Sequence, residues 1–570
     1  MILAAFALSS PLATADTLYY EGWGYWNTPS HWWTDASGTP AGRIPTADTD
    51  VIVSGVGLSD NSTQINTTGI DTIKSLTFDG TQTFGNTQNI WFHDGFTISG
   101  DFYYATSGTG NMLAFVGTDR EFNVGGSFTV DASANSGRSW VAFYRQTTTD
   151  SRIGTVNIKN GLEIIGGTGN VAMLTLNAKD TFVTGKVRLA NANSVLNLTR
   201  AIKTNDTYVN NFTCDGLDGT GKITIGATPY GGTGTPTVIQ NMIFTNSTDS
   251  SFDGISKGQY NDSAANITDA SELNIEMNAA NSGAVQTLRL KQSAYATVAD
   301  NISVKNGHLN LYGDTAFKTL SISGGRFGAA AAADPRATAP DIGSVAFESG
   351  AWSGGAIVFD ISTSAASFDK ISFSGTFDKA EGAEISLQFE FDADGMRDLI
   401  EMGESTFEDL ITYAEGSSIE GTVLRGVSNG FSYEAVFGAT GMDVAFAQIP
   451  EPAAFAAAFG GLAPALPPGR ARKWGGILRK LRRQARPPAA FFLPFFSFAR
   501  ARRAGKFAFC AAREILRFFR SRAERRAQGI LRLPRAASGL RKRGRYFPPS
   551  ARRAASTDFI PIVSVSQVNP

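Results

Sequence analysis

The residue types that most often do chemistry are few in this chain and lie far apart. There are three histidines, His31, His93 and His308, and their spacing fits no zinc site. Gly-rich stretches such as 166–169 are not followed by helical patterns, so turns explain them better than phosphate-binding loops. A Gly-x-Ser-x-Gly elbow between a strand and a helix is also missing. The sequence therefore predicts no catalytic residue and no cofactor.

One acidic cluster has spacing that could meet a calcium ion. Asp392, Asp394 and Asp398 place three carboxylates within seven residues, but the fuller Asp ladder and the distal Glu of a calcium loop are missing. The alternative is a solvated turn that opens a short helix at 396–402. We treat the three aspartates as a weak calcium candidate and otherwise predict no metal site.

The main enzymatic alternative is a polysaccharide lyase or hydrolase. Parallel β-helices carry both activities, with acidic residues and Lys or Arg gathered on one face. Here the acidic residues are scattered over turns, and Lys and Arg are sparse before residue 450. Only the analogy of fold supports this alternative, which predicts that acidic and basic side chains converge in one groove.

Any functional side chains must be positioned by short segments in which apolar and polar residues alternate. Residues rich in Val, Ile, Thr and Phe alternate with polar residues, and Gly, Asn, Asp and Ser separate the segments, which is typical of many short strands. The theme of strand, Gly-containing turn and second strand recurs about every 20 to 35 residues. Clear examples are 73–78, 122–130, 156–158 with 162–164, 187–189 with 195–198, and 302–304 with 309–311.

This periodicity predicts an all-β fold, a right-handed parallel β-helix or solenoid, over residues 16–447. Inward positions would hold β-branched and aromatic residues that stack from coil to coil. Tight corners would use Gly pairs at 125, 166 and 324, Asn-Gly at 160 and 306, and Asp-Gly at 79 and 218. A sandwich array is the alternative fold.

The two ends of the strand-rich region have distinctive motifs. Residues 26–33 read Trp-Asn-Thr-Pro-Ser-His-Trp-Trp, followed by Pro45 and Asp48, and residues 368–377 contain an Asp-Lys-hydrophobic-x-hydrophobic-Ser-Gly pattern. Both resemble autotransporter-associated β-strand repeat proteins, at the opening and closing repeats. An aromatic cluster at the first motif would cover the open end of a solenoid.

Export is predicted from the first fifteen residues. Residues 1–15 are apolar, and Ala13 and Ala15 are the small residues that a signal peptidase requires before Asp16. An ordinary apolar N-terminus is the alternative. The two cysteines, Cys214 and Cys510, lie in compositionally different parts, so we expect no structural disulfide. No apolar run between residues 16 and 450 approaches the ~20 residues of a membrane-spanning helix.

The charge changes sign sharply after residue 450. The first 450 residues hold 24 Lys and Arg against 47 Asp and Glu, whereas the remaining residues hold 26 against 4. The break falls at Pro450-Glu451-Pro452, followed by an apolar run over 453–463. This arrangement, assigned to 448–466, resembles a PEP-CTERM sorting signal. The resemblance implies transient anchoring in the inner membrane of a Gram-negative bacterium, cleavage by an exosortase-type enzyme and delivery to the surface.

The tail departs from that family. Pro464, Pro467 and Pro468 break the apolar run, so as written it is too short to span a bilayer. Residues 467–570 form a basic, low-complexity tail of Arg, Ala, Pro and Phe without a sustained period, as GC-rich DNA gives when read out of frame. We interpret this tail as frameshifted. The alternatives are a tail that binds nucleic acid or an anionic membrane, and an unstructured tail without function.

These observations favour an exported structural or adhesive protein of the cell surface or extracellular matrix. Its mechanism would be contact along an extended polar surface, with extracellular glycans or surface proteins as partners and no nucleic acid.

Overall fold

A computed structural model describes residues 16–449 apart from fourteen short segments: 21–23, 54–63, 80–86, 93–94, 106–109, 117–118, 135–137, 145–151, 199–204, 226–234, 259–266, 291–298, 314 and 332–341. These described residues fall in one compact unit of the chain. Ala13 and Ala15 of the expected signal peptide, His93, the motif Pro450-Glu451-Pro452 and the tail at 467–570 lie outside the described residues.

The chain is all-β, as the sequence predicts. Alternation of apolar and polar residues sets the inward and outward faces of each strand. In β7 (Ser75–Asp79), Leu76 and Phe78 are buried, while Ser75, Thr77 and Asp79 alternate with them and face outward. All the strand segments anticipated from the sequence are strands in the structure, among them β15 (Ile153–Ile158) and β16 (Gly161–Ile165).

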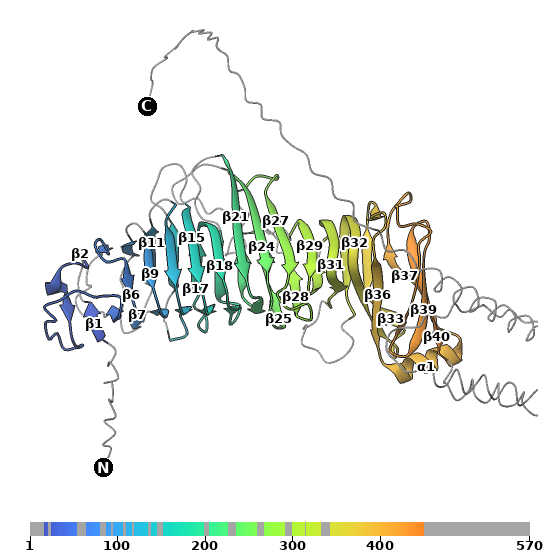
Figure 1. Cartoon of the computed structure of the whole chain (residues 1–570), viewed down its shortest axis with the longest axis horizontal. Coiled ribbons are helices and arrows are strands. Elements are labelled where there is room, and N and C mark those ends of the chain that lie inside the picture. Colours follow the sequence, from blue (N-terminus) through green and yellow to red (C-terminus); the bar gives the residue numbers. More distant parts are fainter. Residues whose placement is uncertain are drawn as a thin grey trace, which may run out of the picture. The chain divides into compact units, whose positions relative to one another are not determined.

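Most strands form three parallel rows, which Figure 1 shows as strands lying side by side. Each strand pairs in parallel with the strand of the same row one coil later. Row one consists of β6 (Thr72–Ile73), β9 (Phe96–Ile98), β12 (Glu121–Val124), β15, β18 (Ala178–Val183), β21 (Thr207–Cys214), β24 (Thr237–Phe244), β27 (Glu272–Asn278) and β29 (Asn301–Asn306).

Rows two and three complete each coil. Row two consists of β1 (Asp16–Tyr20), β4 (Thr49–Val53), β7, β10 (Phe102–Ala105), β13 (Ser127–Asp131), β16, β19 (Val187–Leu189), β22 (Leu217–Gly219), β25 (Ser250–Asp253), β28 (Val285–Leu290) and β30 (His308–Gly313). Row three consists of β2 (Gly24–Tyr25), β5 (Gln64–Asn66), β8 (Thr87–Phe92), β11 (Gly110–Val116), β14 (Ser139–Tyr144), β17 (Ala172–Leu176), β20 (Ser194–Asn197), β23 (Lys222–Thr224) and β26 (Ile255–Ser256). This stacking is the arrangement expected of a solenoid; the solenoid itself and its right-handedness stay predictions.

Rows one and two merge in the later coils. The long strand β31 (Phe317–Ala329) pairs first with β29 and then with β30. It is followed in the sheet by β32 (Ser344–Ser362). Successive parts of β32 then pair in parallel with β34 (Lys370–Phe373), β35 (Phe377–Lys379) and β36 (Ile385–Phe391).

The interior consists of stacked apolar side chains. Phe102 lies opposite Phe128 in the next coil, and their rings are parallel within 7° with centroids 4.4 Å apart. Parallel in-register pairing forces such stacking because equivalent inward positions lie about 4.8 Å apart. The expected β-branched and aromatic inward positions are therefore occupied as predicted.

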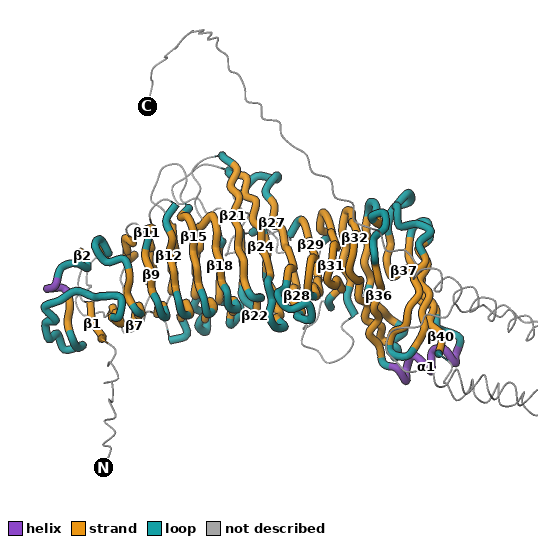
Figure 2. The backbone as a smooth tube through the Cα atoms, viewed as in Figure 1, coloured by secondary structure: helices purple, strands orange, loops and turns teal. Residues whose placement is uncertain are grey.

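Glycine corners join row one to row two, where Figure 2 shows short loops between the strands. A Cβ on Gly125 would lie 2.2 Å from the carbonyl oxygen of Ser99 in the preceding coil. Gly161 has a φ of 140°, which side-chain-bearing residues rarely adopt. The Gly-Gly and Asn-Gly turns anticipated at 125 and 160 are thus required by close approach of successive backbones.

The N-terminal end of row two is covered by an aromatic cluster. One edge of β1 pairs in parallel with β4, and the other pairs antiparallel with β3 (Trp32–Trp33), which follows η1 (Pro29–His31). Trp26 and Trp32 are fully buried, and the Trp32 indole N–H donates to the carbonyl oxygen of Trp26 at 2.8 Å. Because β3 occupies the edge that β1 would otherwise expose, the sheet does not begin with an open edge there.

The C-terminal end is antiparallel. The hairpin of β38 (Val423–Ser428) and β39 (Phe431–Phe437) pairs with β40 (Gly441–Gln448), which pairs with β37 (Thr406–Thr412). The two-residue β33 (Ser367–Phe368) also pairs antiparallel, with β32. The sequence pattern over 16–447 did not separate these strands from the parallel ones. No helix among the described residues is long and apolar enough to cross a membrane.

The motif at 368–377 acts at this transition. Asp369 is buried, and its carboxylate accepts hydrogen bonds from the backbone N–H groups of Gly343 (2.6 Å) and Asp360 (2.8 Å). It therefore ties the start of β34 to both ends of β32, and Gly375 leaves space for the carbonyl oxygen of Glu348.

Candidate functional site

Two of the three aspartates proposed for calcium, Asp392 and Asp394, lie at the start of α1 (Ala393–Met402), the helix anticipated at 396–402, and the third, Asp398, is exposed in the middle of that helix. The Asp392 carboxylate accepts from the backbone N–H of Gly395 at 2.7 Å and so caps the helix, while Asp394 pairs with Arg397 at 2.6 Å. Among the described residues, no group of three His, Cys, Asp or Glu side chains could hold a metal ion. A helix cap and an ion pair account for Asp392 and Asp394.

The two described histidines lie far apart in the fold. His31 is in η1 at the N-terminal end, and His308 opens β30 and is buried. Burial, and then the charge of Arg326, lower the pKa of His308 to about 4, although Asn310 and Asp249 act in the opposite direction. A neutral buried imidazole is a packing residue rather than a proton carrier at neutral pH.

Opposite charges pair one with another across adjacent coils. Glu163 in β16 pairs with Arg188 in β19, and Arg289 in β28 pairs with Asp253 in β25 at 2.5 Å. Such pairs hold neighbouring coils in register.

A buried aspartate binds two lysines. The carboxylate of Asp300 lies 2.9 Å from Lys257 Nζ and 3.0 Å from Lys318 Nζ, and it also accepts from the backbone N–H of Leu273. The hydrogen bond to Asp300 raises the pKa of Lys318. The carboxylate of Asp300 is buried, Lys257 is mostly buried and Lys318 is 42% exposed, so this ion network reaches the surface only through Lys318.

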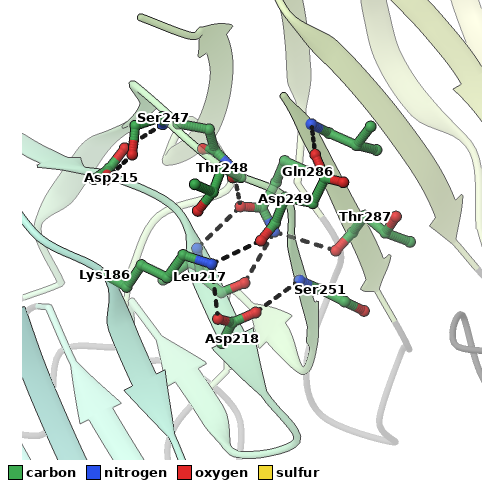
Figure 3. Close-up of polar contacts among 12 residues, drawn as sticks. Lys186, Asp215, Leu217, Asp218, Ser247, Thr248, Asp249, Ser251, Gln286 and Thr287 are labelled. Carbon is green, nitrogen blue, oxygen red and sulfur yellow. Dashed lines mark hydrogen bonds and ion pairs between the residues drawn. The ribbon is translucent and has the colours of Figure 1, made fainter. Parts of the chain in front are cut away.

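The corner between rows one and two carries a larger polar network, drawn in Figure 3. Lys186 Nζ lies 3.3 Å from the Asp218 carboxylate and donates to the carbonyl oxygen of Asp249 at 2.7 Å. The buried Gln286 side chain mimics a peptide group: its Oε1 accepts from Leu217 N–H (2.9 Å) and its Nε2 donates to Leu217 C=O (3.1 Å). These contacts join residues of several successive coils, so the network is best explained as stabilising the packing of the coils at this corner.

Three carboxyl groups have lowered pKa values. The Arg43 guanidinium lowers the pKa of Asp16, and hydrogen bonds lower the pKa of Asp35 and of Asp378. A general acid needs a raised carboxyl pKa to hold its proton near neutral pH.

A ladder of polar side chains lies on the outward face of row one. Asn211 Nδ2 donates to Asp180 Oδ1 at 2.8 Å, and Asn241 Nδ2 donates to Asn211 Oδ1 at 2.9 Å. The series continues from Asn274 to Asn241 (3.1 Å), from Asn301 to Asn274 (2.8 Å) and from the Thr319 hydroxyl to Asn301 (2.8 Å). We call these six residues, Asp180, Asn211, Asn241, Asn274, Asn301 and Thr319, the asparagine ladder.

A search of protein-family models finds no match, and a search of curated proteins finds none either.

The asparagine ladder was not predicted from the sequence. A signal was present, because Asn211, Asn241, Asn274 and Asn301 each immediately precede an apolar residue that faces inward. The ladder residues are separated by 31, 30, 33, 27 and 18 residues, so no fixed period aligns them.

Proposed function

We propose that the protein is an exported structural or adhesive protein of the cell surface or extracellular matrix, acting by contact without catalysis. The asparagine ladder is the observation that carries this proposal, because it aligns polar side chains on the outward face of six successive coils. Many weak, regularly spaced contacts add along such a surface. The pairing of charges across coils, as in Glu163 with Arg188, also supports a scaffold role over a catalytic one.

Export is tested by locating the full chain in the cells that make it. Intact cells are treated with a protease and probed with an antibody to residues 16–449, with a periplasmic protein as the lysis control. We expect the antigen to be digested and the mature N-terminus to be Asp16. An Ala15→Arg variant should accumulate as precursor, because the peptidase site requires a small residue there. Protein found in the cytoplasm with its first fifteen residues intact would refute the proposal.

Sorting through Pro450-Glu451-Pro452 by an exosortase-type enzyme is part of the proposal and has its own test. The gene is sequenced again across the codons for residues 450–470 and read in all three frames. A frame that continues the apolar run, adds a few Arg codons and then stops supports sorting and removes the basic tail. Confirmation of the present frame in the expressed protein rules out the sorting signal as described.

A further inference from the structure

Two members of the asparagine ladder keep unused hydrogen-bonding capacity. A side-chain amide has two N–H donors and two carbonyl lone pairs, and the ladder uses one of each. The nitrogens of Asn274 and Asn301 also lie 3.5 and 3.4 Å from the Glu272 carboxylate. By contrast, Asn211 and Asn241 each retain an N–H and a lone pair that no described side chain takes. Both side chains are half-buried on the outward face.

Apolar side chains share the outward face of these strands with the two amides. Phe182 is 43% exposed and Val209 is 48% exposed, both unusual values for large hydrophobic residues in this chain. The register places Val209 opposite Ile239, Asn211 opposite Asn241, and Thr213 opposite both Phe182 and Ile243. We call this surface the amide patch: Phe182, Val209, Asn211, Thr213, Ile239, Asn241 and Ile243.

The charge around the amide patch limits what it can bind. None of its side chains is charged. Outward carboxylates border it: Asp180 on the preceding strand, and Glu272 and Glu276 on the following one. The guanidinium of Arg152 contacts its backbone and donates to the carbonyl oxygen of Val209 and to the Asn210 side chain, each at 2.9 Å. Of these, Glu276 pairs with Lys305 at 2.7 Å. Carboxylates at the border repel polyanions, whereas a neutral ligand meets no electrostatic penalty.

Together these features match the chemistry of a neutral polysaccharide. Sugar rings present hydroxyl groups, which pair with side-chain amides, and apolar C–H faces, which pack on an aromatic ring such as Phe182. Equivalent residues on neighbouring strands are about 4.8 Å apart, of the order of one sugar ring. We propose that the amide patch binds a strand of neutral polysaccharide running across β18, β21 and β24. This inference rests on the proposed adhesive function and gives it a site and a ligand class.

The test measures retention of the full-length protein on cellulose, on chitin and on dextran gel, with polygalacturonate as the anionic comparison. We expect retention on at least one neutral glycan that is unaffected by added NaCl. Phe182→Ala and Asn241→Ala should each weaken it by about tenfold, since each removes one stacking or hydrogen-bonding group. Tyr25→Ala is the matched control, because Tyr25 is an exposed aromatic residue on β2, outside the patch. Tyr25→Ala should leave retention on the neutral glycan unchanged.

Three results would overturn the inference. Retention that is equal in wild type and in the Phe182→Ala and Asn241→Ala variants would place binding elsewhere. Retention on polygalacturonate alone, lost in NaCl, would show an ionic surface instead. If no neutral glycan retains the protein while protease treatment still shows it at the cell surface, the amide patch fails as a glycan site and the exported function stands. Phe182→Ala keeps the test valid if Asn241→Ala misfolds, because Phe182 is 43% exposed and is not part of the hydrophobic core cluster.

Discussion

Asn211 Nδ2 donates a 2.8 Å hydrogen bond to Asp180 Oδ1 in the neighbouring strand of row one. An ionised carboxylate can only accept, so the Asn211 amide must turn its nitrogen toward Asp180 and its oxygen toward the next coil. That orientation then fixes the amide of Asn241, and so on to the Thr319 hydroxyl. One carboxylate therefore sets the direction of the whole asparagine ladder, and aligned hydrogen bonds of this kind strengthen one another.

Removing that carboxylate should weaken the stack of coils. We expect Asp180→Ala to lower the free energy of unfolding by about 1 kcal/mol, because a charge-assisted hydrogen bond is lost from a half-buried site. Urea unfolding measures the change. Asp269→Ala is the control: its side chain is exposed, and the substitution should stay within about 0.5 kcal/mol. Equal effects of the two substitutions would contradict a special role for Asp180.

Stability should depend on pH through His308. The folded-state pKa of about 4 lies below the ordinary value of 6.5, so between these values the unfolded chain binds the proton more readily. The contribution of the neutral ring is therefore complete above pH 6.5 and is lost as the pH falls toward 4. A shift of this size corresponds to at most about 3 kcal/mol.

The measurement compares urea midpoints at neutral pH and near pH 4.5 for wild type and His308→Gln. Glutamine does not titrate, so the variant should lose less stability on acidification than the wild type does. An identical loss in both proteins would assign the acid sensitivity to other groups.

Tyr104 is expected to be a site where a substitution stabilises the protein. Its side chain is fully buried, its hydroxyl has no hydrogen-bond partner among the described residues, and burial raises its pKa. Tyr104→Phe removes an unsatisfied polar group and should raise the free energy of unfolding by about 1 kcal/mol. In the matched variant Tyr433→Phe, a hydroxyl that donates to Leu387 C=O at 2.9 Å is lost, so stability should fall. Thermal and urea unfolding show whether the free energy of unfolding rises or falls in each variant. A lower free energy of unfolding in both variants would contradict the expectation.

Gly219 tests the close approach of the coils. Its φ is 111°, and a Cβ there would lie 1.9 Å from the carbonyl oxygen of Leu189. Gly219→Ala should cost more than about 3 kcal/mol, because backbone strain and a clash with rigid backbone add. Gly169 has a φ of 87° but open space around its Cβ position, so Gly169→Ala should cost only about 1 kcal/mol. Similar unfolding midpoints for the two variants would show that the coils can separate at Leu189.

Local patterning was sufficient to predict the all-β class, the strand segments, the helix at 396–402 and the glycine turns at 125 and 160. Each depends on neighbouring residues: alternation sets the faces of a strand, and glycine permits the turn that follows. The aromatic cluster at residues 26–33 also suggested an end cover, because indole rings are costly to leave exposed at an open sheet end.

Long-range register decided what the sequence did not predict. The asparagine ladder joins residues 18 to 33 positions apart, and its members become neighbours only when coils of unequal length stack with one pairing register. The same register brings Glu163 and Arg188 together as a pair and places Phe182 opposite Thr213, on the outward face that also carries Asn211 and Asn241. Chain alternation fixes which way each side chain points, whereas only the tertiary pairing of strands fixes which side chains meet.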